Sequence, residues 1–310
     1  MSAKNVEESE ADEMMSRCAS CGKPENEQIK LRKCTACHLV RYCGVKCQKE
    51  HRPKHKKECR KRAAELRDEL LFKQPESTHY GNCQICCLPM PDDPKKSTMM
   101  TCCSKTICNG CDLANLKRQI EQQRQWKSCP FCRHPTPTSQ GEAVRMVMKR
   151  VEANDLDALQ QLGTIRFTEG DYRGAFEYLT KAATLGDAAA HYQLSCLYGL
   201  GEGVEKDEKK ELYHLEQAAI GGHPTARYNL GATEWNNGRY ERAVKHYIIA
   251  ANLGHDESLE KLKEFYEVGL VSKDEFASTL RTHHAAVDAT KSPQREAAEA
   301  NADYQLHVGW

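Results

Sequence analysis

The sequence predicts a multidomain protein in which two small zinc-stabilised modules precede an all-α solenoid of helix-turn-helix repeats. Three observations support this fold class. Sixteen of the 17 cysteines lie before residue 133, hydrophobic residues are only 39% of the 310-residue chain, and similar phrases recur beyond residue 150 at steps of 36 and 32 residues. So little apolar material in a chain of this length favours several small modules over one large core.

Composition also limits the classes of partner and compartment. The 45 basic residues nearly balance the 44 acidic ones, which argues against nucleic acid as a general partner. The sequence has no run of about 18 apolar residues, so we expect no membrane span. The first residues are acidic where a signal peptide would be basic and then apolar. We therefore expect an intracellular protein, in the cytoplasm or nucleus or both, whose paired cysteines bind zinc rather than form disulfides.

The first group of candidate ligands lies between residues 16 and 60. C-x-x-C spacing lets two thiolates converge on one ion from a single turn, and eight ligands make two tetrahedral sites. The last four fall at steps of about one or two helical turns, so one helix can present them on one side. The expected ligands are Cys18, Cys21, Cys34, Cys37, Cys43, Cys47, His55 and Cys59, with His51 in reserve.

The order of these eight ligands and the ending RYCGVKCQKEHRPKHKKEC resemble the MYND zinc finger. The resemblance implies a protein-binding module, often for proline-rich peptides, that holds two zinc ions by interleaved ligand sets. Arg52 departs from the pattern, because the family usually has tryptophan there. The implied sets are Cys18, Cys21, Cys43 and Cys47 for one ion, and Cys34, Cys37, His55 and Cys59 for the other.

The second group of cysteines, within residues 79–135, predicts two more zinc sites. Two C-x-x-C pairs supply a complete first site, namely Cys83, Cys86, Cys108 and Cys111. The second site takes a third pair, Cys129 and Cys132, together with two ligands from the stretch TCCSKTIC.

Ile85 between the first ligand pair, and the closing motif CPFCR at 129–133, make this segment resemble a RING domain. Where that family has a histidine ligand this chain has Lys105, and a protonated lysine cannot bind zinc. We therefore expect Cys102 to join Cys103 in the second site, which needs a sharp turn because adjacent cysteines point apart in an extended chain. The competing ligands are Cys87, His79 and His134.

The RING resemblance implies a surface for a ubiquitin-conjugating enzyme at Ile85, Pro130 and Arg133. Asn115 stands where many active members have tryptophan, and Trp126 is a candidate replacement. Fold alone does not establish activity. We therefore prefer a structural, protein-binding module here, and we expect no catalytic metal because four ligands close each site.

Repeated phrases mark the C-terminal half. KAATLG at 181–186 returns as QAAIGG at 217–222 and AANLG at 250–254, and periods of this length indicate helix-turn-helix pairs stacked as a solenoid. The alanines allow close helix crossing, and the glycines can end helices in the left-handed conformation. Recurrent Leu162, Leu194 and Leu230 are predicted core residues.

These phrases resemble Sel-one-like repeats, relatives of the tetratricopeptide repeat. The loop residues Gly201, Gly203, Val204 and Asp207 match that family's G-x-G-V-x-x-D pattern. The resemblance implies a scaffold whose concave face binds a protein or peptide. Cys196 within the repeats is expected to be a small buried hydrophobe.

The predicted organisation follows from these segments. It comprises a disordered leader at 1–15, a MYND finger at 16–60, a helical spacer at 61–78, a RING-like module at 79–135, a linker at 136–150, repeats with a capping helix at 151–285, and a disordered tail at 286–310.

The predicted function is a zinc-binding adaptor for protein partners, with two zinc ions in the finger and two in the RING-like module. One alternative is a RING-type ubiquitin ligase that recruits a conjugating enzyme. Another is a transcriptional regulator acting through the MYND-like finger and the basic residues that follow it. A lysine methyltransferase is excluded, since no catalytic segment for that reaction is recognisable.

Overall fold

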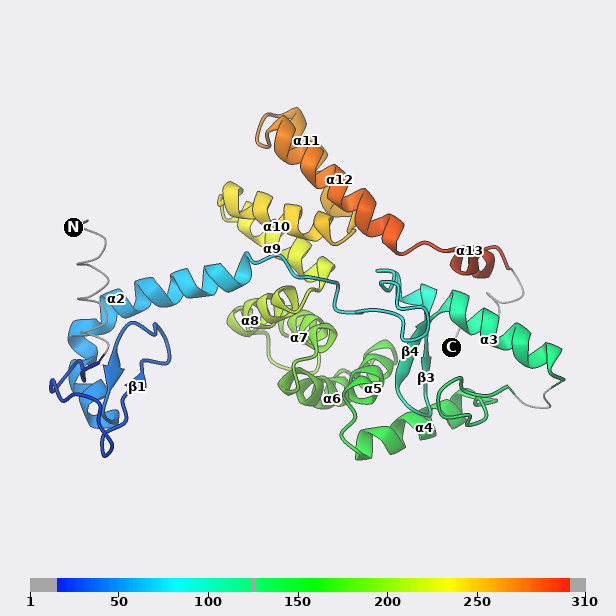
Figure 1. Ribbon diagram of the computed structural model, residues 1–310, viewed down its shortest axis with the longest axis horizontal. Helices are drawn as coiled ribbons and strands as arrows, with labels where there is room; N and C mark the ends of the chain where they lie inside the picture. Colours follow the sequence, from blue (N-terminus) through cyan, green and yellow to red (C-terminus); the bar gives the residue numbers. More distant parts are fainter. Residues whose placement is uncertain (1–15, 124–126, 302–310) are drawn as a thin grey trace. The chain divides into compact units, whose positions relative to one another are not determined.

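The computed structural model describes residues 16–123 and 127–301 in two compact units, one up to Lys73 and one from Gln74 onward. The expected leader at 1–15, Trp126 and the last residues of the expected tail lie outside the described residues. Zinc-type modules followed by a helical solenoid confirm the predicted fold class (Figure 1). No helix in the described part of the chain combines the length and apolar character needed to cross a bilayer.

The first unit is a small hairpin and one long helix. Strands β1 (Arg32–Lys33) and β2 (Arg41–Tyr42) pair antiparallel, and helix α2 runs from Val45 to Leu71. The core is mostly sulfur, with Leu31 and Tyr42 as its buried apolar side chains besides cysteines. So small an apolar core cannot hold the unit by itself, which fits a fold stabilised by metal.

Helix α2 crosses the predicted boundary between finger and spacer without a break. Its 27 residues span about 40 Å. The helix ends at Leu71, before the end of the predicted helical spacer at residue 78. The finger and the spacer therefore share one helix.

The second unit begins with the RING-like module. The 3-10 turn η1 (Pro94–Lys96) leads into strands β3 (Ser97–Met100) and β4 (Lys105–Cys108), which pair antiparallel from Ser97↔Cys108 to Met100↔Lys105. Helix α3 (Asn109–Glu121) follows directly. Met90, Met100 and Ile107 pack with the cysteines to form the core of the module.

The solenoid follows, with each helix packed against the next in chain order (Figure 1). Its helices are α4 (Gln140–Glu152), α5 (Leu156–Thr168), α6 (Tyr172–Thr184), α7 (Ala188–Leu200), α8 (Glu208–Ile220), α9 (Pro224–Asn236), α10 (Tyr240–Asn252), α11 (Asp256–Glu267) and α12 (Lys273–Ala289). Helix α4 begins inside the predicted linker, because Ser139 caps its N-terminus by accepting from the Glu142 amide.

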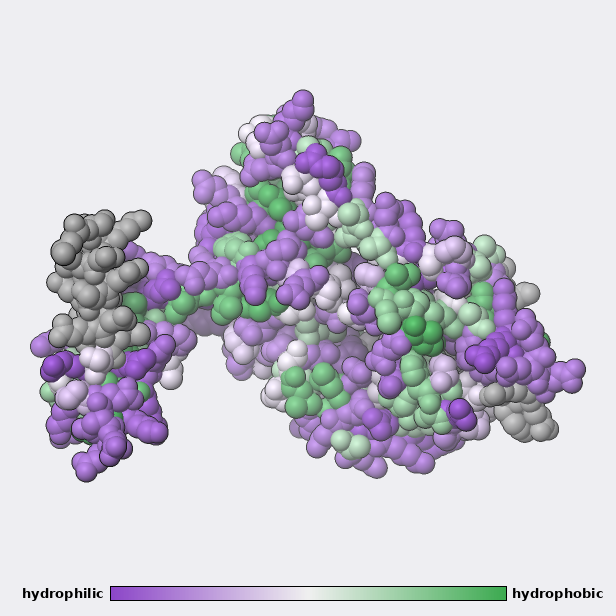
Figure 2. All heavy atoms as spheres, in the orientation of Figure 1, coloured by the Kyte–Doolittle hydropathy of each residue, from purple (hydrophilic) through white to green (hydrophobic). Residues whose placement is uncertain are grey.

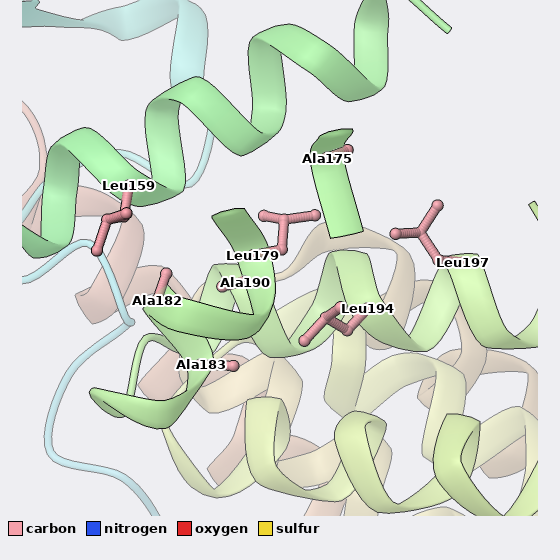
Figure 3. Packing of buried hydrophobic residues seen from close by; sticks show 8 residues of the cluster. All are labelled: Leu159, Ala175, Leu179, Ala182, Ala183, Ala190, Leu194 and Leu197. Carbon is pink, nitrogen blue, oxygen red and sulfur yellow. The ribbon is translucent and has the colours of Figure 1, made fainter. Parts of the chain in front are cut away.

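Small residues let the repeat helices approach closely. Ala182, Ala218 and Ala250 are fully buried, as predicted. The glycines at the repeat ends have the predicted positive φ, 92° at Gly186, 83° at Gly222 and 92° at Gly254. Leucines fill the space between helices, and Figure 3 shows one such cluster around Leu179 and Leu194.

The predicted loop between α7 and α8 is a structural element of the solenoid. Gly201 ends α7 with φ 75°, and Asp207 caps α8 by accepting from the amides of Lys209 and Lys210. A Cβ on Gly203 would lie 2.6 Å from the carbonyl carbon of Tyr172. The glycine therefore permits a close approach between this loop and α6.

The prediction of a disordered tail from residue 286 is wrong for its first part. Helix α12 continues to Ala289, and Pro293–Glu299 form a further helix, α13. Ser292 caps α13 and proline occupies its first turn, a start signal readable in the sequence. The helix is stable without an internal apolar period because it packs on α3, where Ala298 contacts Leu113.

The segment before the RING-like module lies along the solenoid. The His79 amide donates to the Gly222 carbonyl at 3.0 Å, and Gln74 contacts the Ile249 carbonyl and Asn252. The His79 ring stacks on His223 with the ring centroids 4.2 Å apart. The segment from Gln74 to His79 and the repeats thus pack against each other.

Replacing Leu179 by alanine is predicted to destabilise the solenoid by about 2–5 kcal/mol, since it opens a cavity in a fully buried cluster. Urea unfolding followed by circular dichroism measures the loss. Leu185→Ala is the matched control, because Leu185 is 55% exposed and its loss should cost less than about 0.5 kcal/mol. Equal stability of the two variants would contradict the packing described here.

Candidate metal centres

Four clusters of possible metal ligands occur among the described residues. Within each cluster the donor atoms all lie within 4.8 Å of one another. The clusters are Cys18, Cys21, Cys43 and Cys47; Cys34, Cys37, His55 and Cys59; Cys83, Cys86, Cys108 and Cys111; and Cys102, Cys103, Cys129 and Cys132. The structure thus brings together the sixteen preferred ligands of the sequence prediction, in the expected sets.

The spacing of the sulfur atoms suits a tetrahedral zinc ion. Zinc–sulfur bonds of about 2.3 Å place two sulfurs of a tetrahedron about 3.8 Å apart. The Sγ–Sγ distances are 3.6 Å for Cys21–Cys43, 3.8 Å for Cys34–Cys59, 3.8 Å for Cys86–Cys108 and 3.7 Å for Cys103–Cys129. All the cysteines are free thiols, and four of them in so small a space are chemically suited to one cation.

One turn geometry recurs at five pairs of neighbouring ligands. The residue after the second cysteine has a positive φ, and its amide donates to the carbonyl four residues earlier at 2.8–3.0 Å. This turn aims both thiols at one point. The residues in the left-handed position are Gly22, His38, Cys87, Ser104 and Arg133.

In the MYND-like finger, this turn supplies half of each cluster, and the other half comes from α2 and from Cys43 just before it. Cys43 precedes the helix and Cys47 lies in its first turn, with their sulfurs 3.5 Å apart. Further along, His55 is buried and its Nε2 lies 3.1 Å from the Cys37 sulfur. Cys59 follows one helical turn later.

His51, the reserve ligand, lies outside both clusters. Its Nδ1 is 3.1 Å from the Tyr42 hydroxyl, and its ring stacks on that of His55. It therefore orients a neighbouring ligand instead of acting as one. Arg52, at the position of the family's tryptophan, is exposed to solvent.

The second RING-like cluster shows how adjacent cysteines converge. The amides of Cys103 and Ser104 both donate to the Met100 carbonyl, and Ser104 has φ 58°. Met100 thus stands at the position that the first ligand cysteine has in the other turns. The two ligands are instead the adjacent residues Cys102 and Cys103. The sulfur of Cys102 lies 3.2 Å from that of Cys132.

The competing ligands are placed elsewhere. Cys87 is exposed in the left-handed position of its turn, and His79 packs on the solenoid. His134 contacts the Pro135 carbonyl through Nδ1. Lys105, at the family's histidine position, places its ammonium 4.6 Å from the centre of the Phe131 ring.

Backbone hydrogen bonds at these sites also lower the pKa of three thiols. Burial raises the pKa of Cys18, Cys34 and Cys83, but hydrogen bonds from backbone amides, including that of Cys108 to the Cys83 sulfur, outweigh it, and the pKa of each falls to about 6. Because the thiolate is the form that binds metal, these amides prepare the three thiols to bind an ion.

The proposed contact surface for a conjugating enzyme is open in part. Ile85 is 43% exposed, Pro130 is half-buried and Arg133 is exposed. Asn115, in place of the family's tryptophan, donates to the Ser128 carbonyl at 3.4 Å. That asparagine therefore anchors the loop that carries the last two ligands.

The solenoid carries an open hollow of about 230 Å³ among α7, α8 and α9. Polar and apolar side chains share its wall, and Cys196 is half-buried there, which corrects the expectation of a buried core residue. The lining residues are Ser195, Cys196, Glu211, Leu215, Asn229, Ala232 and Thr233.

Comparison with known families decides the nature of the two flanking modules. The MYND finger family model matches residues 18–59, and the Sel1 repeat model matches 158–187, 188–223 and 224–255. The chain carries a MYND finger and three Sel1 repeats. Both are modules that generally bind proteins, and their identification confirms the two resemblances noted in the sequence.

Curated relatives are similar to parts of this chain. The mouse DAP3-binding cell death enhancer 1 is 26% identical over 50% of this chain, and chitin synthase regulatory factor 4 of Schizosaccharomyces pombe is 26% identical over 41%. The putative RING finger protein ORF96 of Ostreid herpesvirus 1 is 34% identical over 20%. The matches span 38%, 21% and 27% of these proteins, respectively.

Among solved structures, the Sel1 repeat protein from Oxalobacter formigenes is similar at 24% identity. The match covers 56% of this chain and 70% of that one, with a TM-score of 0.42.

Replacing Cys102 by serine is predicted to lower the zinc content of the purified chain by about one ion, because a four-ligand site loses a thiolate. Elemental analysis of metal per chain provides the measurement. Cys87→Ser is the matched control, since Cys87 lies nearby but outside the clusters. Loss of zinc from the Cys87 variant, with none from the Cys102 variant, would reverse the assignment.

Proposed function

We propose that this protein is an intracellular adaptor in which zinc-stabilised modules and a Sel1 solenoid bind different protein partners. The observation that carries the proposal is the closed ligand set of each cluster. Four protein donors converge at each site, as in structural zinc sites, whereas catalytic zinc sites keep a position for water or substrate. The metal content of the adaptor is two ions in the MYND finger and two in the RING-like module.

The solenoid offers the second binding surface. Its hollow among α7, α8 and α9 presents the Asn229 amide and the Thr233 hydroxyl beside apolar Leu215. A peptide can find both hydrogen bonds and apolar contact on such a surface. The MYND finger belongs to the other compact unit, so two partners can be held by separate parts of one chain.

Two variants separate the surfaces of an adaptor. Cys34→Ser removes a finger ligand, and Thr233→Arg fills the solenoid hollow with a larger charged side chain. Affinity capture with quantitative mass spectrometry is expected to lose one set of partners with the first variant and a different set with the second. The two sets should co-purify only on the unaltered chain.

Thr282→Arg is the matched control for the solenoid variant. Both threonines donate to the carbonyl four residues earlier, Thr233 to Asn229 and Thr282 to Ser278, but Thr282 is exposed on α12. It should retain every partner. Capture that both test variants leave unchanged would refute the adaptor proposal.

A second candidate function is that of a RING-type ubiquitin ligase. The observation favouring it is Ile85, an apolar side chain 43% exposed between two cluster cysteines. The likeness to the putative RING finger protein ORF96 adds support. In this function the module docks a ubiquitin-conjugating enzyme through Ile85, Pro130 and Arg133, while the solenoid selects the substrate.

Autoubiquitination by the full chain across a panel of conjugating enzymes tests the ligase function. Formation of ubiquitin conjugates is expected to fall at least about tenfold with Ile85→Ala, which corresponds to about 1.4 kcal/mol of lost docking energy. Ile120→Ala is the control, since Ile120 is 66% exposed on α3 of the same module. Silence of the unaltered chain with every enzyme in the panel would exclude this candidate.

A further inference from the structure

The C-terminal helix α13 reaches the first RING-like cluster, and its Arg295 is 209 residues from Cys86 in sequence. Arg295 of α13 is only 5% exposed. Its Nη2 donates to the Cys86 sulfur at 3.5 Å and to the Leu88 carbonyl at 3.3 Å. Its Nη1 donates to the Pro89 carbonyl at 2.6 Å. One guanidinium thus donates hydrogen bonds both to a candidate ligand sulfur and to the backbone carbonyls that follow it.

The helix is placed for this contact by a specific close approach. A Cβ on Gly110 of α3 would lie 2.7 Å from the Arg295 nitrogen and 2.8 Å from the carbonyl carbon of Gln294. Backbone therefore meets backbone at a position where only glycine fits. Lys96 and Glu299 form an ion pair at 2.9 Å at the far end of α13.

Charge explains why an arginine is buried here. A zinc ion with four thiolates carries excess negative charge, and a buried cation requires such a partner. The guanidinium remains charged at all physiological pH values and has several donors in a fixed plane. It can therefore neutralise the cluster while it satisfies the Leu88 and Pro89 carbonyls.

We propose that Arg295 is an outer-shell partner of the zinc site formed by Cys83, Cys86, Cys108 and Cys111, and that α13 is an integral part of the RING-like module. The proposal rests on the zinc content proposed above. Arg295 acts through Cys86. Its hydrogen bond holds the Cys86 sulfur in position to bind the ion and so slows dissociation of the metal. Outer-shell partners of this kind affect metal affinity by about 10–100-fold.

The test measures zinc release from the full-length protein into a chromogenic chelator, with the amplitude calibrated as ions per chain. Arg295→Met retains length and packing but removes charge and donors. One ion per chain is expected to leave about tenfold faster or more, while the others leave at the original rate. Arg281→Met is the matched control, because Arg281 is exposed on α12, and it should release zinc as the unaltered chain does.

Gly110→Ala is the second variant, and it keeps Arg295 and every ligand. Alanine favours helix α3 itself, but its Cβ forces α13 away, so the same ion should become labile. This variant decides the question if circular dichroism shows that Arg295→Met does not fold. Release at the original rate from a folded Arg295→Met chain, or from Gly110→Ala in its place, overturns the proposal.

The starting metal content distinguishes this proposal from the one on which it rests. Elemental analysis that finds less than one zinc for each of the four clusters in the unaltered chain refutes the proposed zinc content. Four zinc ions with unchanged release in the variants refute only the role of Arg295 and leave the adaptor intact.

Discussion

Both zinc-type modules depend on one constraint: two neighbouring side chains must point at one ion from a single turn. In five of these turns a residue adopts the left-handed conformation, and its amide donates a hydrogen bond to the carbonyl four residues earlier. Only Gly22 among these positions is glycine. His38, Cys87, Ser104 and Arg133 adopt a conformation that L-residues disfavour, so the converged ligands must offset this cost.

This constraint also resolves the irregular site. The adjacent Cys102 and Cys103 belong to one cluster because the turn begins at Met100. The Met100 carbonyl accepts the hydrogen bonds of the turn, but its side chain is not a ligand. Lys105 is free of any ligand role and lies over the Phe131 ring. The site thus keeps four donors although the usual histidine is replaced.

The RING-like module and the solenoid belong to one compact unit, held together by segments that are distant in sequence. His79 stacks on His223 before the module begins, and Arg295 reaches its ligand loop from beyond the last repeat. Met99 of β3 also packs with the α4–α5 cluster. Figure 2 shows several apolar patches, in green, among the hydrophilic residues, and Ile85 is one of the exposed large hydrophobic residues.

The sequence alone predicted the C-x-x-C pairs and the repeats, because both are local patterns. C-x-x-C spacing is set by the reach of one turn, and Leu162, Leu194 and Leu230 recur with the repeat period. The tertiary structure alone decided that Cys87 is left out, that Cys196 lines a hollow, and that Pro293–Glu299 fold as a helix. These outcomes depend on contacts between distant segments: a short helix with no apolar period is stable only where a surface such as Gly110 and Leu113 receives it.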